Sequence, residues 1–159
     1  MLRISRLADY GTVVMTFLAK NRDPEVPGEL MQANARTIAT ETHLTVPTVS
    51  KILKLLLHAG LLISHRGIRG GYQLAKSAES ISIAEIILAL EEKTGLTECS
   101  HSNHHCTLSP QCAIRENWLT LNRAIQKALE SVSLNHLISP HFDETMVNVS
   151  AIKTALPNR

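Results

Sequence analysis

Apolar positions recur at helical spacing through most of the first 135 residues, and they alternate only near residues 61–74. Ser5 can cap a first helix that runs to about Lys20. Its apolar residues fall three and four apart, and we expect them to form a buried stripe: Leu7, Tyr10, Val14, Phe17 and Leu18. Residues 21–34 contain two prolines and a glycine among polar residues, so they are predicted to form a loop.

Two helical patterns follow, over residues 37–41 and 46–58, separated by a short break. Thr45 can cap the second helix, and Pro47 is tolerated in its first turn because no intrahelical N–H bond is lost there. The apolar residues of the two patterns can pack together: Ile38 and Ala39 against Val49, Ile52, Leu53 and Leu56. A helix, tight turn and second helix in this order predict a helix-turn-helix, whose second helix reads DNA.

A glycine-rich turn at residues 65–71 lies between two strand-like runs, 61–63 and 72–74. Its glycines permit positive φ and close backbone approach, while Arg66 and Arg69 are expected to project outward. The pattern predicts a β-hairpin wing. A phosphate-binding loop is a poor alternative, since no Lys-Ser/Thr pair and no following helix complete one.

Positive charge is concentrated in this predicted unit. Residues 1–76 carry ten Lys/Arg and five Asp/Glu, and no acidic residue lies between Glu41 and Glu79. A basic block suits a phosphate backbone, although an ordinary solvated face would also be basic. The polar face of the second helix argues against a buried two-helix hairpin. The expected contacts to double-stranded promoter DNA are Thr45, Thr48, Val49, Ser50, Lys51, Lys54, Arg66, Arg69 and Gly70.

Two further helices are predicted in the second half of the chain. Ser82 and Glu85 form a capping box that opens a helix to about Glu92, with Ile83, Ile86, Ile87 and Leu90 facing the core. Residues 113–132 form a longer helix with a heptad seam. Its members are Ile114, Trp118, Leu121, Ile125, Ala128 and Val132. Such a seam favours a homodimer, the alternative being a helix packed only within its own domain.

Three cysteines lie in the polar segment before that long helix. Six residues separate Cys99 from Cys106, and five separate Cys106 from Cys112. The same segment holds His101, His104 and His105. Thiolates and imidazoles gathered in a segment too polar to fold alone suggest a soft metal centre. The spacing does not match common zinc fingers, and incidental thiols in a histidine-rich loop are the plainer alternative.

Several classes of protein are disfavoured. No run of about 18 uncharged apolar residues suggests a membrane span, and residues 1–9 lack the layout of a signal peptide, so we expect a cytoplasmic protein. Neither a substrate-binding carboxylate nor a Ser/His constellation stands out, so we expect no enzyme and no small-molecule substrate. The fold class is mainly α: a winged helix-turn-helix over 1–76, sensing and dimerisation over 77–135, and a flexible tail over 136–159.

The chain resembles the family of iron–sulfur-cluster-sensing winged-helix repressors that includes IscR and NsrR. More narrowly, it resembles the subgroup that regulates SUF-type Fe–S assembly genes. The resemblance covers roughly residues 1–135. Its carriers are residues 1–11, the helix from Pro47, the wing at 65–72, and the cysteine triplet followed at once by the long helix.

The resemblance implies a homodimer with crossed long helices and a 2Fe–2S or 4Fe–4S cluster held by Cys99, Cys106 and Cys112. IscR-like members have a histidine three residues after the last cysteine, where this chain has Arg115. NsrR-like members use an aspartate of the partner's first helix, which Asp9 matches; otherwise Asp9 is an exposed first-turn carboxylate. His101, His104 and His105 remain alternative ligands.

The expected function is repression of Fe–S assembly or related stress genes under cluster control. Three alternatives stay open. The same module could sense zinc or thiol oxidation without a cluster, the chain could be an iron–sulfur enzyme or electron carrier, or the winged helix could serve only as a protein-binding scaffold.

Overall fold

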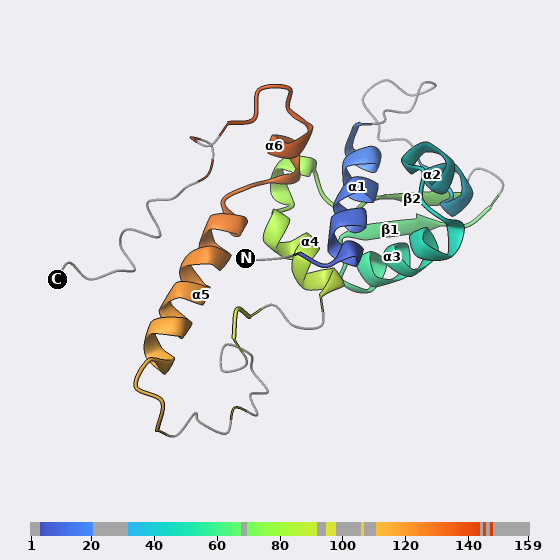
Figure 1. The fold of residues 1–159 in the computed structure, drawn as a ribbon. Helices are drawn as coiled ribbons and strands as arrows, with labels where there is room; N and C mark the ends of the chain where they lie inside the picture. Colours follow the sequence, from blue (N-terminus) through green and yellow to red (C-terminus); the bar gives the residue numbers. More distant parts are fainter. Residues whose placement is uncertain are drawn as a thin grey trace.

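The computed structural model describes residues 4–20, 32–67, 70–91, 95–97, 106, 111–143, 145 and 147. Helices dominate and one antiparallel β-hairpin accompanies them, which confirms the expected fold class (Figure 1). The elements are α1 (Arg6–Lys20), α2 (Ala35–Thr42), α3 (Val46–His58), β1 (Leu62–His65), β2 (Gly71–Leu74), the 3₁₀ turn η1 (Ala78–Ser80), α4 (Ile83–Leu90), α5 (Arg115–Glu130) and α6 (Leu134–Ile138).

The helix-turn-helix is formed by α2 and α3. Asn34 caps α2, since its Oδ1 accepts from the N–H groups of Arg36 at 3.0 Å and Thr37 at 2.9 Å. Because of this cap, α2 begins two residues before the predicted start at Thr37. His43 turns the chain with a left-handed φ of 56°. The α3 helix has the predicted bounds, and Thr45 caps it by accepting from the N–H of Thr48 at 3.4 Å.

The wing hairpin pairs Leu62 with Leu74 and His65 with Gly71. Gly67 has a φ of +120°, the conformation that glycine favours. At Gly71 the absence of a side chain allows close backbone packing, because a Cβ there would lie 2.7 Å from the Ala33 carbonyl carbon. Ala33 and Tyr72 exchange two backbone hydrogen bonds, of 3.1 and 2.9 Å, which tie the hairpin to the start of α2.

The core lies where α1 crosses α4, with α2, α3 and the hairpin on one side and α6 on another (Figure 1). The buried face of α1 differs from the predicted stripe: it consists of Ala8, Gly11, Val14, Met15, Leu18 and Ala19. Leu7, Tyr10 and Phe17 are only partly buried and pack at the edge of the core. Gly11 accounts for part of this rotation, because a Cβ at that position would overlap the Leu90 side chain.

The C-terminal part corrects two predictions. The α5 helix is shorter than the expected 113–132, and Val132 lies beyond it, 7% exposed in the chain's own core. Val132 is held there because its carbonyl accepts from the Ile83 N–H at 2.8 Å. The predicted flexible tail from residue 136 is also wrong at its start, since Ser133 and His136 cap α6, which packs on α1.

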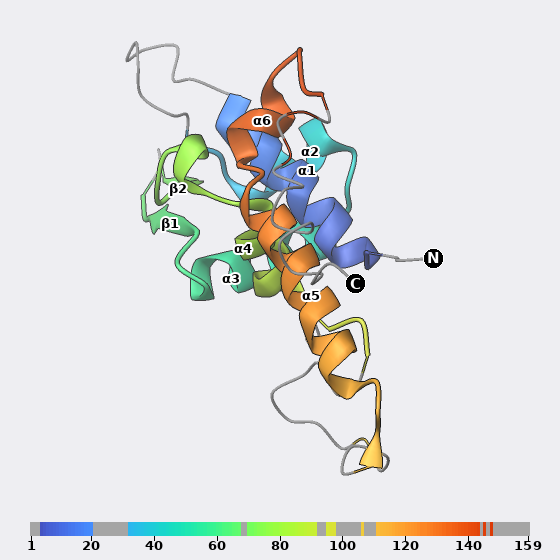
Figure 2. The same cartoon turned by 90° about the vertical axis from the view of Figure 1, so that its left-hand side faces the viewer.

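The N-terminal half of α5 extends away from the rest of the molecule (Figures 1 and 2). Its C-terminal half packs on α4, where Ala124 is 3% exposed. Within the part of the chain that the structure describes, no helix combines the length and apolar character needed to span a membrane.

Candidate DNA interface and metal centre

The N-terminal half of α3 presents polar and basic side chains. Thr45, Ser50, Lys51 and Lys54 are exposed, and Thr48 is partly buried. The Thr45 and Thr48 hydroxyls share a hydrogen bond of 2.8 Å, so the cap and the expected base-reading position are joined. Val49 is 0% exposed and belongs to the core. Its side chain therefore does not reach DNA, which corrects that expected contact.

The wing adds positive charge beside α3. Arg66 is exposed at the tip of the hairpin, whereas Arg69 lies outside the described residues. Gly70 is partly buried, and its N–H donates to the Gly67 carbonyl at 3.0 Å, so that amide is occupied in the turn. His65 is also exposed next to Arg66, a position that sequence reasoning did not single out as a contact.

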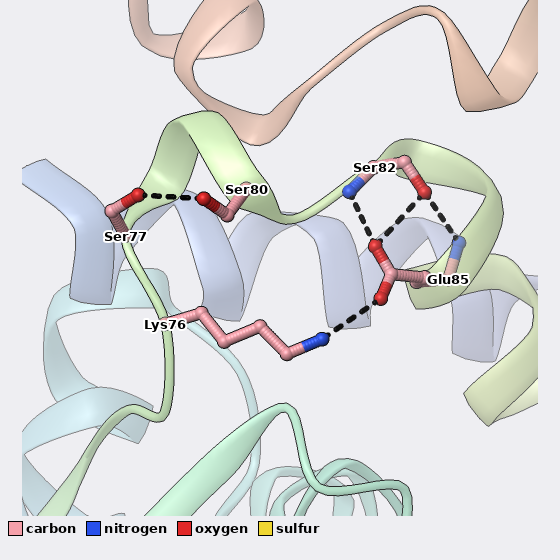
Figure 3. Close-up of polar contacts among 5 residues, drawn as sticks. All are labelled: Lys76, Ser77, Ser80, Ser82 and Glu85. Carbon is pink, nitrogen blue, oxygen red and sulfur yellow. Dashed lines mark hydrogen bonds and ion pairs between the residues drawn. The ribbon is translucent and has the colours of Figure 1, made fainter.

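A polar contact joins the base of the wing to α4 (Figure 3). Lys76, two residues beyond β2, places its Nζ 3.2 Å from Oε1 of Glu85. The other oxygen of Glu85 accepts from the N–H of Ser82 at 2.8 Å, which completes the predicted capping box. The Ser82 N–H lowers the pKa of Glu85 below its ordinary value, and Lys76 adds to this while partial burial opposes it.

Two of the three cysteines are described, and both are free thiols that are partly buried. Cys112 lies just before α5, and its carbonyl accepts from the Arg115 N–H at 3.3 Å. Ile114 occupies the N-cap without a side-chain hydrogen bond, so the positive end of the α5 dipole lies close to Cys112 in the sequence. Arg115 itself forms an ion pair with Glu116 at 3.0 Å. Cys99, His101, His104 and His105 lie outside the described residues.

Asp9 lies in the first turn of α1 and is exposed. It contributes to the wall of a groove of about 400 Å³ between α1, α4 and α6. The other groove residues are Ile4, Arg6, Thr12, Ile83, Ile87 and Leu137. Among the described residues, no three His, Cys, Asp or Glu side chains gather into a metal site. Asp9 and the two described cysteines therefore do not meet in one such group within a chain.

The predicted seam of α5 divides between two faces. Ile114 and Leu121 are 54% and 39% exposed, which is high for large apolar side chains. Ile125 instead lines a small pocket against α4. Trp118 and Ala128 are partly buried. The apolar surface left open on this chain thus lies mainly toward the N-terminal half of the helix.

Comparison with known proteins identifies the family of this chain. Residues 4–140 match the model of the Rrf2 family, described as an iron-dependent transcriptional regulator. The chain belongs to the Rrf2 family. The match extends past the end of α6, in agreement with the packing of that helix.

Rrf2 relatives cover most of this chain. Protein rrf2 of Nitratidesulfovibrio vulgaris is 28% identical over 137 residues, 86% of this chain and 87% of the relative. The HTH-type transcriptional regulator NsrR of Oceanobacillus iheyensis is 30% identical over 141 residues, covering 86% and 90% of the two chains.

Solved Rrf2-like structures share the fold. CymR, the global cysteine regulator of B. subtilis, superposes with a TM-score of 0.64 at 28% identity, covering 89% of this chain and 99% of CymR. IscR of T. potens superposes with a TM-score of 0.62 at 26% identity, covering 86% of each chain. Like these relatives, the chain is a helix-turn-helix transcriptional regulator and not an enzyme.

Proposed function

We propose that this Rrf2 protein is a homodimeric repressor that binds promoter DNA of Fe–S assembly or related stress genes and whose DNA affinity is controlled by an iron–sulfur cluster. The observation that carries the proposal is the pair of free, partly buried thiols, Cys106 and Cys112, placed directly before the long helix of an Rrf2 regulator. Residues 1–76 form the DNA-binding part in this proposal, and α4 and α5 carry sensing and dimerisation.

DNA binding follows from the exposed face of α3. Its N-terminal residues Thr48 and Ser50 are placed to meet base edges, whereas Lys51 and Lys54 suit phosphates. Arg66 of the wing would reach the backbone or the adjacent minor groove. No acidic side chain lies between Glu41 and Glu79 to oppose this positive field.

The donor set fits an iron–sulfur cluster. Cysteine thiolates are the usual protein ligands of such clusters, and the positive end of a helix dipole favours a thiolate close to it. Asp9 supplies an exposed carboxylate that makes no side-chain hydrogen bond or ion pair within the described part of the chain. Cys99, Cys106 and Cys112 would hold the cluster, with Asp9 of the partner subunit as the fourth ligand and His101, His104 or His105 as alternatives.

Control of DNA binding would arise from what these ligands connect. Cys112 precedes α5, and Asp9 belongs to α1, which packs against α4. The bound cluster supplies a link between the long helix of one subunit and the first helix of the other. With that link, α1 and α5 would fix the angle between the two wings and hence the half-site spacing.

Purification without oxygen tests the proposal. We expect a coloured protein with matched iron and sulfide, and an Asp9→Ala variant whose visible spectrum is bleached or shifted. Glu41→Ala, an exposed carboxylate on α2, is the matched control and should leave the spectrum unchanged. A colourless wild-type protein after attempted reconstitution would contradict the cluster.

A second candidate is supported by the likeness to CymR, the global cysteine regulator of B. subtilis. In this case Cys106 and Cys112 would respond to zinc or to thiol oxidation without a cluster. Zinc content, or DNA binding that changes on oxidation of a colourless protein, would favour this candidate over the first.

A further inference from the structure

A side chain of α5 holds the backbone just before the cysteine segment. The N–H of Leu96 donates to Oδ1 of Asn122 at 3.1 Å, a partly buried contact between residues 26 apart in sequence. Leu96 precedes Cys99 by three residues, and Asn122 lies within α5, whose start follows Cys112. The contact therefore joins the chain just before the first cysteine to the helix just after the last.

The surroundings of this contact are mostly apolar. Leu96 and Asn122 both line a pocket of about 70 Å³ between α4 and α5, together with Ala84, Ile87, Leu88 and Ile125. A backbone N–H that loses its acceptor in such a place is poorly compensated by water. Asn122 is thus the polar residue that allows the Leu96 backbone to settle against two apolar helix faces.

A second contact lies at the C-terminal end of α4. Glu91 is the C-cap residue of α4, and its Oε1 accepts from the N–H of Ser5 at 2.9 Å. Ser5 immediately precedes α1, and its carbonyl accepts from the N–H of Asp9 at 3.0 Å. Glu91 is consequently held to the start of α1, and Leu96 is held to α5.

We propose that Asn122 is a positioning residue for the cluster ligands: by holding Leu96, it fixes the point from which the chain departs toward Cys99. This inference rests on the proposed function, because it takes the cluster as what the three cysteines bind. Holding Leu96 lowers the conformational entropy lost when the cluster binds. With Leu96 already fixed, fewer residues lose conformational freedom when the thiolates converge, so the bound cluster is retained for longer.

The test compares three variants of the full-length protein, each loaded with cluster under anaerobic conditions. Asn122→Ala removes the acceptor, and Asn122→Asp keeps an oxygen at Oδ1. Gln126→Ala is the matched control, since Gln126 lines the same pocket but bonds to Glu130 at 2.9 Å. Loss of the cluster to an iron chelator, followed by absorbance, should be roughly three- to tenfold faster in Asn122→Ala. The other two variants should stay close to wild type.

Amide hydrogen exchange of the cluster-free protein gives an independent readout. The Leu96 N–H should exchange faster in Asn122→Ala than in wild type, and Asn122→Asp should restore its protection. Equal cluster loss in Asn122→Ala and wild type, or equal acceleration in Asn122→Ala and Gln126→Ala, would overturn the inference alone. A wild-type protein that takes up no cluster would overturn the proposed function, and this role of Asn122 with it.

Discussion

One side chain, that of Glu85, connects the base of the wing to α4. Glu85 contacts Ser82 through one carboxylate oxygen and Lys76 through the other, so one residue caps α4 and anchors the base of the wing (Figure 3). The ion pair is partly solvent-exposed and contributes little by itself. The cap contributes more, because it satisfies backbone N–H groups that the helix leaves open.

Ser82→Ala should lower the free energy of unfolding by about 1 kcal/mol, since the N–H of Glu85 loses the hydroxyl that accepts from it at 3.2 Å. Denaturant unfolding measures this as a lower midpoint with an unchanged slope. Ser80→Ala is the control, because among the described residues the Ser80 hydroxyl bonds to that of Ser77 at 3.0 Å and to no helix N-terminus. Equal midpoints for Ser82→Ala and wild type would show that the Ser82 cap does not stabilise the fold.

Glu85 also predicts a pH dependence. Its pKa is lower in the folded chain, so its carboxylate stabilises the fold above the ordinary carboxyl pKa. That contribution is lost as the pH falls through the lowered pKa. Glu85→Gln should therefore reduce the loss of stability in acid relative to wild type, measured as unfolding free energy against pH. Parallel curves for the two proteins would show that Glu85 is not responsible.

Among the helices and strands, the ends of individual elements could be predicted from the sequence. The way in which the helices face one another could not. The bounds of α3 and the Ser82–Glu85 box were predictable because capping needs only residues three or four apart. The buried face of α1 was not, because it depends on where α4 crosses it. The crossing is set at Gly11 by the Leu90 side chain, a contact that spacing along α1 cannot reveal.

Gly11→Ala tests that crossing. An added Cβ would overlap Leu90, so the two helices must shift, and the expected loss of stability is about 1–3 kcal/mol despite the better helix propensity of alanine. Leu90→Ala alone should also destabilise the fold, because Leu90 is buried at 4% exposure. In the double variant the loss in thermal unfolding should be smaller than the sum of the two single losses, because the clash is removed. A Gly11→Ala protein more stable than wild type would show that the helices do not meet so closely.

The basic side chains of α3 are expected to contact DNA phosphates. Lys54→Ala should weaken binding to operator DNA and reduce the slope of log affinity against log salt by about 0.9, the value expected for one lost phosphate contact. Lys127→Ala, an exposed lysine on α5, should leave the slope unchanged. An unaltered slope in Lys54→Ala would place the phosphate contacts elsewhere.

In the whole molecule, the N-terminal half of α5 extends away from the body (Figure 2). Ile114, just before this helix, and Leu121 within it are exposed. The heptad spacing predicted a seam, and the exposure of Ile114 and Leu121 agrees with surface available to a second copy. Spacing alone also placed Val132 in the seam, although the backbone pairing with Ile83 draws it into the core. The α6 helix escaped prediction because five residues give too short a pattern.

Leu121→Asp should shift the protein toward monomer in sedimentation experiments, because a carboxylate would be buried without a partner in the proposed helix pair. Lys127→Asp places the same carboxylate at an exposed position of the same helix and serves as the control. A Leu121→Asp protein that remains dimeric at low micromolar concentration would place the dimer interface on another surface.

In the proposed function, the regulator has one affinity for DNA with the cluster bound and another without it. The most direct measurement is the dissociation constant for one operator at fixed salt, using a single anaerobic preparation before and after cluster removal. We expect the two dissociation constants to differ by at least about fivefold, the lower end of common allosteric coupling, and to differ less in Asp9→Ala. Equal affinities for the two forms of a properly loaded wild-type protein would contradict this prediction.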